Sequence, residues 1–139
     1  MILDSNEYIT GIPLIDNQHK QYVNLVNRLI IDHNKGCMEK ATLNNYIKEV
    51  FSYAVEHFDA EEYLMRSAKY PLYEEHLAKH NIFRDKADWF LIEIDVKELD
   101  IKNYVNELYK WIVDWFKEQV LNDDVKLAKF LRDKNLVKP

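Results

Sequence analysis

Four of the five histidines in this sequence fall on helix faces that are otherwise apolar. His76 and His80 are four residues apart, and so are His57 and the carboxylate residue Glu61. On an α-helix, side chains at this spacing share one face, with Cβ atoms roughly 5–6 Å apart. A histidine pair can therefore bind one metal ion, and the glutamate adds an oxygen that can bridge two ions. Such ligands favour iron, manganese or zinc over Cu(I), which prefers sulfur.

The apolar pattern around these residues predicts the helices that must position them. Apolar residues recur every three or four positions in segments at about 17–35, 42–68, 71–94, 101–121 and 124–133. Residues 1–15 are expected to form an extended arm, and Gly36 is a natural helix end. We predict an all-α, up-down-up-down four-helix bundle with this N-terminal arm and a short C-terminal helix.

Composition supports one helical domain, residues 1–139, and argues against several classes of function. Only 2 Gly and 3 Pro are present, too few for a many-turned β fold. The net charge of −5 without a basic block argues against nucleic-acid binding. No stretch reaches the roughly 18 apolar residues of a membrane span, and the single cysteine, Cys37, forms no internal disulfide. We expect a cytoplasmic monomer with no membrane partner.

Each histidine also has an ordinary structural explanation. A lone histidine on an apolar face is usually a hydrogen-bonded core residue, and His57 with Glu61 could be a simple ion pair worth roughly 0.2–0.5 kcal/mol. Together, however, these residues require the core to bury several imidazoles and a carboxylate. That burial costs on the order of several kcal/mol per uncompensated ion. A metal cluster satisfies all of these groups at once, so the joint pattern favours a metal site.

Several segments, in order, resemble the motifs of the bacterial hemerythrins. They are IDNQH at 15–19, HFDAEEYLM at 57–65, YPLYEEHLAKH at 70–80, and WFKEQV at 115–120 followed by DVKLAKFL at 124–131. The resemblance covers nearly the whole chain and implies two iron ions (Fe2+/Fe3+) with an oxo or hydroxo bridge. Glu61 and Asp124 would bridge the irons. The implied metal ligands are His19, His57, Glu61, His76, His80 and Asp124.

The fourth segment departs from the family pattern at Gln119. The family has a histidine four residues after the tryptophan and five before the bridging aspartate; here Trp115 and Asp124 stand in place, with Gln119 between them. The iron bound by His76 and His80 then lacks its third imidazole. The Gln119 amide oxygen could bind weakly or leave the position to water or hydroxide. We expect the site to assemble with a less stable oxygen adduct. The five-residue spacing also requires the helix to end or loosen there.

By the same resemblance, the iron with two histidine ligands keeps an open position for dioxygen. Tyr22, Phe58, Trp115 and Phe116 are expected to form the oxygen pocket, and the last three would wall the site against water. Tyr22, one turn after His19, stands where the family usually has an aliphatic residue. It is either a large core residue with its hydroxyl at the surface, or a hydrogen-bond donor to the bound ligand.

The resemblance implies a protein that binds dioxygen, for storage, delivery or sensing, rather than an enzyme. The missing histidine keeps two alternatives open: a di-iron enzyme acting on peroxide or nitric oxide, and an iron storage or sensing protein. Ferritin-like enzymes match poorly, because their Glu-x-x-His pairs do not occur in this sequence. Dioxygen is the expected partner, and an electron donor that the sequence does not identify would reduce the irons.

Overall fold

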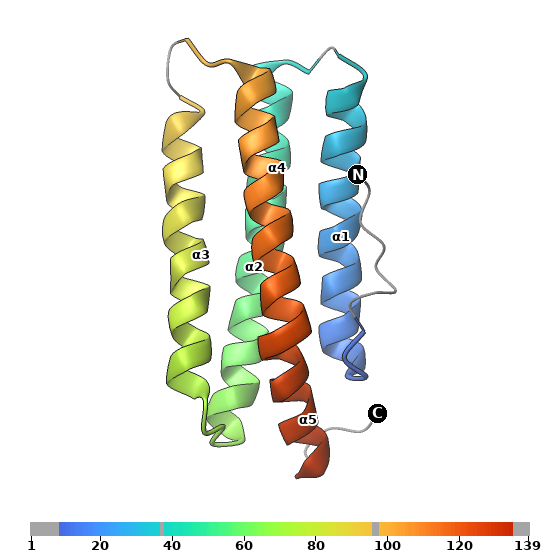
Figure 1. Ribbon diagram of the computed structural model, residues 1–139, viewed down its shortest axis with the longest axis vertical. Coiled ribbons are helices and arrows are strands. Elements are labelled where there is room, and N and C mark those ends of the chain that lie inside the picture. The colour runs from blue at the N-terminus through green and yellow to red at the C-terminus, as the bar shows by residue number, and fades with distance from the viewer. Residues whose placement is uncertain (1–8, 37, 96–97, 135–139) are drawn as a thin grey trace.

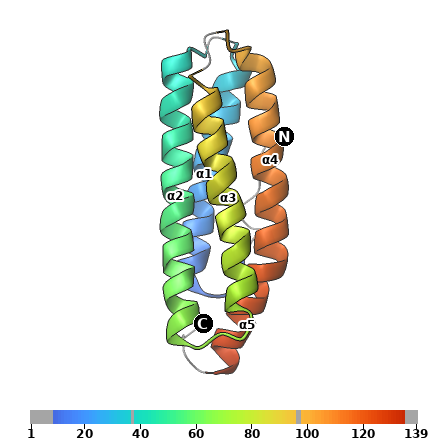
Figure 2. The ribbon, with the colours of Figure 1, turned by 90° about the vertical axis from the view of Figure 1, so that its left-hand side faces the viewer.

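The computed structural model describes residues 9–36, 38–95 and 98–134, and it confirms the predicted bundle. Its main helices are α1 (Pro13–Asn34), α2 (Lys40–Ser67), α3 (Tyr73–Glu93) and α4 (Ile101–Glu118). The chain runs up, down, up and down through them (Figure 1). A π-helical turn, η2 (Gln119–Asp124), joins α4 to α5 (Val125–Asp133), and the three form one continuous rod. Two views at right angles place α1 diagonally opposite α3 (Figure 2).

The first three helices begin at other residues than those predicted. α1 begins at Pro13, so the arm is shorter than predicted; its residues 1–8 lie outside the described residues. Proline is suited to the first helical turn, because its missing N–H has no partner there anyway. α2 begins at Lys40, and α3 begins at Tyr73 after a turn that contains Pro71.

Two glycines and an aspartate fix the ends of α1. Gly36 follows the helix with φ +84°, as expected for a terminating glycine; Cys37 after it lies outside the described residues. Gly11 precedes the helix with φ +89°, and a Cβ there would lie 3.1 Å from Arg132 Nη1. The Asp16 carboxylate accepts hydrogen bonds from the Gly11 N–H at 3.0 Å and from the preceding N–H at 2.7 Å. These contacts hold the start of the helix that carries the first histidine.

Apolar side chains fill the half of the bundle at the α1–α2 and α3–α4 connections, which we call the apolar half. Burying each such side chain contributes roughly 1.5–3 kcal/mol. None of the helices within the described ranges is long and apolar enough to cross a membrane. The apolar half contains the buried residues Val26, Leu29, Leu43, Val50, Phe90, Ile94, Val105 and Leu108.

A smaller apolar cluster closes the other end of the bundle. It joins the start of α1, the α2–α3 connection and α5. Four histidines lie between this cluster and the apolar half, in what we call the metal half: His19, His57, His76 and His80. The closing cluster consists of Ile12, Ile15, Met65, Tyr70, Leu127, Ala128 and Leu131.

Candidate metal centre

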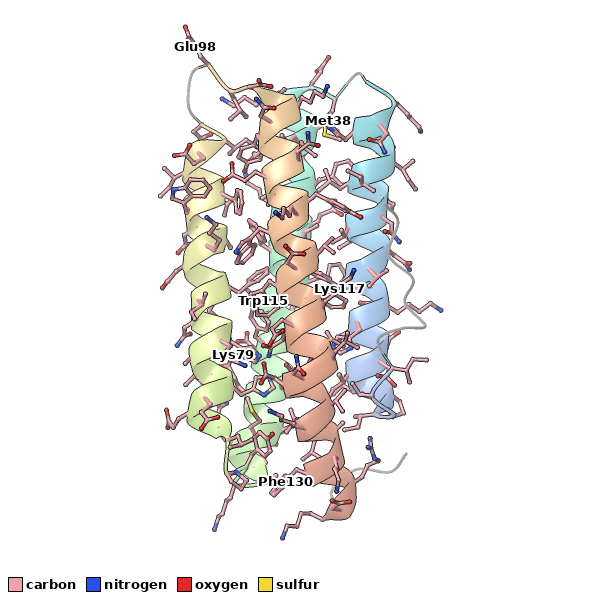
Figure 3. All side chains as sticks on the ribbon, in the orientation of Figure 1. Met38, Lys79, Glu98, Trp115, Lys117 and Phe130 are labelled. Atoms are coloured by element: carbon pink, nitrogen blue, oxygen red, sulfur yellow. The ribbon has the colours of Figure 1, made fainter. Side chains whose placement is uncertain are left out.

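Six ionisable side chains from α1, α2, α3 and η2 meet inside the metal half. All six are buried, and their potential ligand atoms lie within 4.8 Å of one another in each of two groups. Figure 3 shows nitrogen and oxygen atoms gathered between the helices at about the level of Lys79, below Trp115. The first group is His19, His57 and Asp124, and the second is Glu61, His76 and His80.

Asp124 reaches this centre because the helix widens into the π-helical turn. Five residues separate it from Gln119, a spacing that points in different directions on an α-helix but matches one turn of a π-helix. Both side chains are buried, and Gln119 Nε2 lies 3.4 Å from Asp124 Oδ1. The helix therefore loosens without ending, and the predicted short C-terminal helix is a continuation of α4. π-Helical turns are frequent at functional sites.

Asp124 connects the two ligand groups. Its Oδ2 lies 2.8 Å from His19 Nε2 and 3.3 Å from His57 Nε2, and its Oδ1 lies 3.2 Å from His76 Nε2. Burial alone would raise the pKa of this carboxyl, but hydrogen bonds from the three imidazoles hold the pKa well below its ordinary value. Asp124 therefore carries a negative charge in the middle of the bundle.

Glu61 has the fewest hydrogen bonds of the charged groups in the centre. It is fully buried, and neither carboxylate oxygen has a hydrogen-bond partner among the described residues. Its Oε1 lies 3.2–3.4 Å from the Nε2 atoms of His57, His76 and His80, without hydrogen-bond geometry. Burial and the charge of Asp124 raise the pKa of Glu61 well above its ordinary value.

This donor set fits a pair of metal ions. An uncompensated buried carboxylate costs on the order of several kcal/mol, and a cation removes that cost. His80 Nε2 is also buried without a hydrogen-bond partner among the described residues, and it lies 3.2 Å from Glu61 Oε1. Two cations between the ligand groups would satisfy Glu61, His80 and Asp124 together, because each carboxylate already lies beside imidazoles of both groups.

The pKa values of the two imidazoles on α3 are shifted in opposite directions by this environment. Burial would lower the pKa of His76, but its contacts with Asp124 and Glu61 raise the pKa to about 10. Burial and the neighbouring charge on His76 lower the pKa of His80 to about 2. Burial also lowers the pKa of His57. The metal-free centre thus keeps a proton on His76, and a bound metal ion would displace it.

Hydrogen bonds outside the centre orient two of the imidazoles. His80 Nδ1 lies 2.7 Å from Glu62 Oε2, which also accepts a hydrogen bond from Arg84 at 2.7 Å. His57 Nδ1 lies 2.8 Å from Gln18 Oε1. Such partners fix the ring and leave Nε2 free for a metal. These roles could not be predicted from the sequence, because a polar residue beside a candidate ligand resembles a surface residue until the facing helix is placed.

Gln119 lies within the cluster of candidate metal ligands. It is buried, and its Nε2 lies 2.6 Å from His76 Nε2. Rotating the amide by half a turn exchanges its nitrogen and oxygen with little other change. The oxygen would then lie beside His76 Nε2, where a metal held by His76 and His80 would sit. The structure therefore places Gln119 where a ligand would be, and its binding to metal stays a prediction.

A small cavity borders the His19–His57 side of the centre. About 10 Å³ is available to the centre of a water-sized molecule, which is room for about one water. Tyr22 is only 5% exposed and its hydroxyl is buried, so the expectation of a hydroxyl at the surface is wrong. The four residues predicted for the pocket, Tyr22, Phe58, Trp115 and Phe116, all line this cavity.

Comparisons with known proteins agree with this geometry. The family model of the hemerythrin HHE cation binding domain matches residues 10–131. The bacteriohemerythrin of Pseudomonas paraeruginosa is 32% identical over 123 residues, which cover 88% of this chain and 76% of that protein. The bacteriohemerythrin of Clostridium acetobutylicum is 29% identical over 128 residues, 89% of this chain and 96% of that protein.

Solved structures lead to the same fold. A crystal structure of wild-type hemerythrin has a TM-score of 0.79 to this chain, at 20% sequence identity, over 94% of this chain and 97% of that one. The crystal structure of a leucine-to-alanine mutant of hemerythrin gives the same TM-score. Since the family model spans most of the chain and the relatives match along most of its length, this protein belongs to the hemerythrin family of metal-binding four-helix bundles.

Proposed function

We propose that this protein binds two iron ions and, through them, dioxygen. The observation that carries the proposal is Glu61, a fully buried carboxylate that faces three imidazoles and has no hydrogen-bond partner among the described residues. Without a cation, such a buried carboxylate destabilises the folded protein, whereas beside a pair of metal ions it would serve as a ligand. When bound, the irons would supply the electrons for reversible capture of dioxygen.

Each of the two proposed metal positions has its own pair of histidines. In the proposed centre His19 and His57 hold one iron, and His76 and His80 hold the other. Glu61 and Asp124 would contact both irons, and an oxo or hydroxo group would complete the centre. The support is that both carboxylates lie within 3.4 Å of imidazoles from both groups.

The cavity beside the His19–His57 position is the proposed oxygen pocket. Phe58 packs against His80 with ring centroids 4.1 Å apart, and against Trp115 with centroids 5.3 Å apart. Phe116 lies edge-on to His19 at 5.5 Å. These rings exclude bulk water, which would otherwise promote proton transfer to a bound ligand and its loss. Room for about one small molecule favours a diatomic ligand over a larger substrate.

The first test is anaerobic reconstitution with ferrous iron, followed by cycles of oxygen addition and removal. We expect about two irons per chain and a ligand-to-iron charge-transfer band that appears with oxygen and disappears on its removal. Irreversible oxidation, or steady turnover of peroxide or nitric oxide, would contradict a carrier and support an enzyme. Iron well above two per chain would indicate storage. Size-exclusion chromatography of the same sample tests whether the protein is a monomer, as expected.

Gln119 sets the expected lifetime of the oxygen adduct. A neutral amide donates less electron density than an imidazole to the His76–His80 iron, so the iron pair as a whole should retain the adduct less well. We predict that Gln119→His slows loss of the oxygen band severalfold. Glu118→His is the control, because Glu118 is the exposed neighbour and gains the same imidazole outside the centre. Equal lifetimes for Gln119→His and the original protein would show that Gln119 does not govern the adduct.

A further inference from the structure

The hydroxyl of Tyr22 is buried and has no hydrogen-bond partner among the described residues. Among the described tyrosines, Tyr22 and Tyr109 share this condition. Tyr104 shows the usual arrangement, since its hydroxyl donates to the Phe90 carbonyl oxygen at 2.7 Å. A buried phenol normally finds a partner, and an unsatisfied donor lowers the stability of the folded state. The position of the Tyr22 hydroxyl therefore calls for an explanation beyond packing.

Tyr22 lines the same small cavity as His19 and His57. Its ring stacks on Phe116, with centroids 4.9 Å apart and an angle of 27° between the planes. This stacking restricts the ring, so the hydroxyl cannot readily turn away to solvent. Tyr22 follows His19 by three residues on α1, which places both side chains on one face of the helix.

Apart from Tyr22, His19, His57 and Gln18, the side chains around the cavity are aromatic or apolar. Phe58, Phe116 and Ala54 present carbon atoms to it. Gln18 also lines the cavity, but it is partly exposed and its amide oxygen is engaged with His57 Nδ1. Burial raises the pKa of Tyr22, so its oxygen keeps its proton and stays a neutral donor. The cavity thus combines apolar walls with a protonated phenol.

We propose that the Tyr22 hydroxyl donates a hydrogen bond to the small ligand that binds in this cavity at the His19–His57 metal position. This inference rests on the proposed iron centre and makes Tyr22 a selecting residue for its ligands. Ligands that carry a hydrogen-bond acceptor away from the metal, such as reduced dioxygen or a small linear anion, gain this contact. Ligands that carry a poor acceptor, such as carbon monoxide, do not.

The test uses azide, a linear anion with an acceptor at its far end, added to the oxidised iron-loaded protein. Tyr22→Phe should raise the dissociation constant for azide roughly three- to tenfold, as expected for loss of one hydrogen bond. It should also abolish the shift that D₂O causes in the azide stretching frequency. The matched control is Tyr109→Phe, which removes the other unpartnered hydroxyl and should leave both readouts unchanged.

A second readout needs no metal. Tyr22→Phe removes an unsatisfied donor, so the metal-free variant should unfold at the same temperature as the original protein or higher. Tyr104→Phe breaks a hydrogen bond and should unfold at a lower temperature. If Tyr22→Phe loses stability as Tyr104→Phe does, the hydroxyl is structural and the inference is wrong.

The outcomes also separate this inference from the proposed function. If the variant and the original protein both hold two irons and bind azide with equal affinity and equal D₂O shifts, the inference fails and the iron centre stands. If the original protein holds no iron, or shows no azide band, the proposed function fails and the inference fails with it.

Discussion

The two halves of the bundle bury very different side chains with the same four helices. In the apolar half the buried residues are aliphatic or aromatic, and α4 is a regular α-helix. In the metal half the inward positions hold histidines, carboxylates and Gln119, and the helix widens into η2. Apart from Thr10, every buried polar residue in the described part of the chain belongs to the metal half. The difference indicates that the apolar half stabilises the fold, while the metal half holds groups whose burial a cation would compensate.

The largest expected effect comes from damaging the apolar half. Leu29 is fully buried, ten residues after His19 on α1 and so about 15 Å along the helix from it. We predict that Leu29→Ala lowers the free energy of unfolding by about 2.7–5 kcal/mol, the range for such truncations. Denaturant unfolding should show the same loss in metal-free and iron-loaded protein. Iron content should stay at two per chain, and a loss of iron would show that the two halves are not independent.

Glu61→Gln is the opposite experiment, because it changes charge in the metal half and keeps the shape of the side chain. The variant should lose the iron and, with it, the stabilisation that bound metal gives, about 2.7 kcal/mol at a metal concentration 100-fold above the dissociation constant. The metal-free variant should be at least as stable as the metal-free original, since a buried carboxylate has been neutralised. Metal analysis and thermal unfolding measure the two effects.

The control for Glu61→Gln is Glu56→Gln, which neutralises an exposed carboxylate on the same helix. It should change neither iron content nor the stability gained from iron. Retention of two irons by Glu61→Gln would contradict a bridging role for Glu61. A large loss of stability in the metal-free variant would instead mean that the carboxylate has a structural partner.

The comparison also explains which features could be predicted from the sequence. The bundle follows from apolar periodicity, a local property that operates in both halves. The pairs His57–Glu61 and His76–His80 follow from one turn of helix, so their shared faces need no knowledge of the fold. Their meeting with His19 follows from antiparallel packing of neighbouring helices.

Features that depend on a facing helix or an irregular backbone were less predictable. The spacing of Gln119 and Asp124 indicated an irregularity, but not that a π-helical turn would carry the helix through it. The burial of the Tyr22 hydroxyl depends on Phe116 from α4, which stacks on the ring. The role of Glu62 depends on His80 from α3. In each case the deciding contact lies outside the local sequence pattern.

The smallest predicted effect concerns Glu62, which would orient a metal ligand, His80, without binding the metal itself. Glu62 contacts the far nitrogen of His80, and Arg84 holds its carboxylate in place. We predict that Glu62→Gln weakens iron binding about 10- to 100-fold, the usual cost of losing such a partner, without abolishing it. The neutral amide can still accept from His80 Nδ1, but it makes the imidazole a weaker base and loses its ion pair with Arg84. Competition with a chelator measures the change in affinity.

Asp59→Asn is the matched control for Glu62→Gln. Asp59 is an exposed carboxylate that also contacts Arg84, at 3.4 Å, but within the described residues it makes no hydrogen bond or ion pair with His80. Its substitution should leave iron affinity unchanged, because exposed ion pairs contribute only about 0.2–1 kcal/mol and this one does not orient a ligand. If both variants weaken binding equally, Arg84 rather than the His80–Glu62 contact controls the site. If neither does, packing of Phe58 against His80 is sufficient to orient the imidazole, and the metal half depends less on buried charge than the comparison implies.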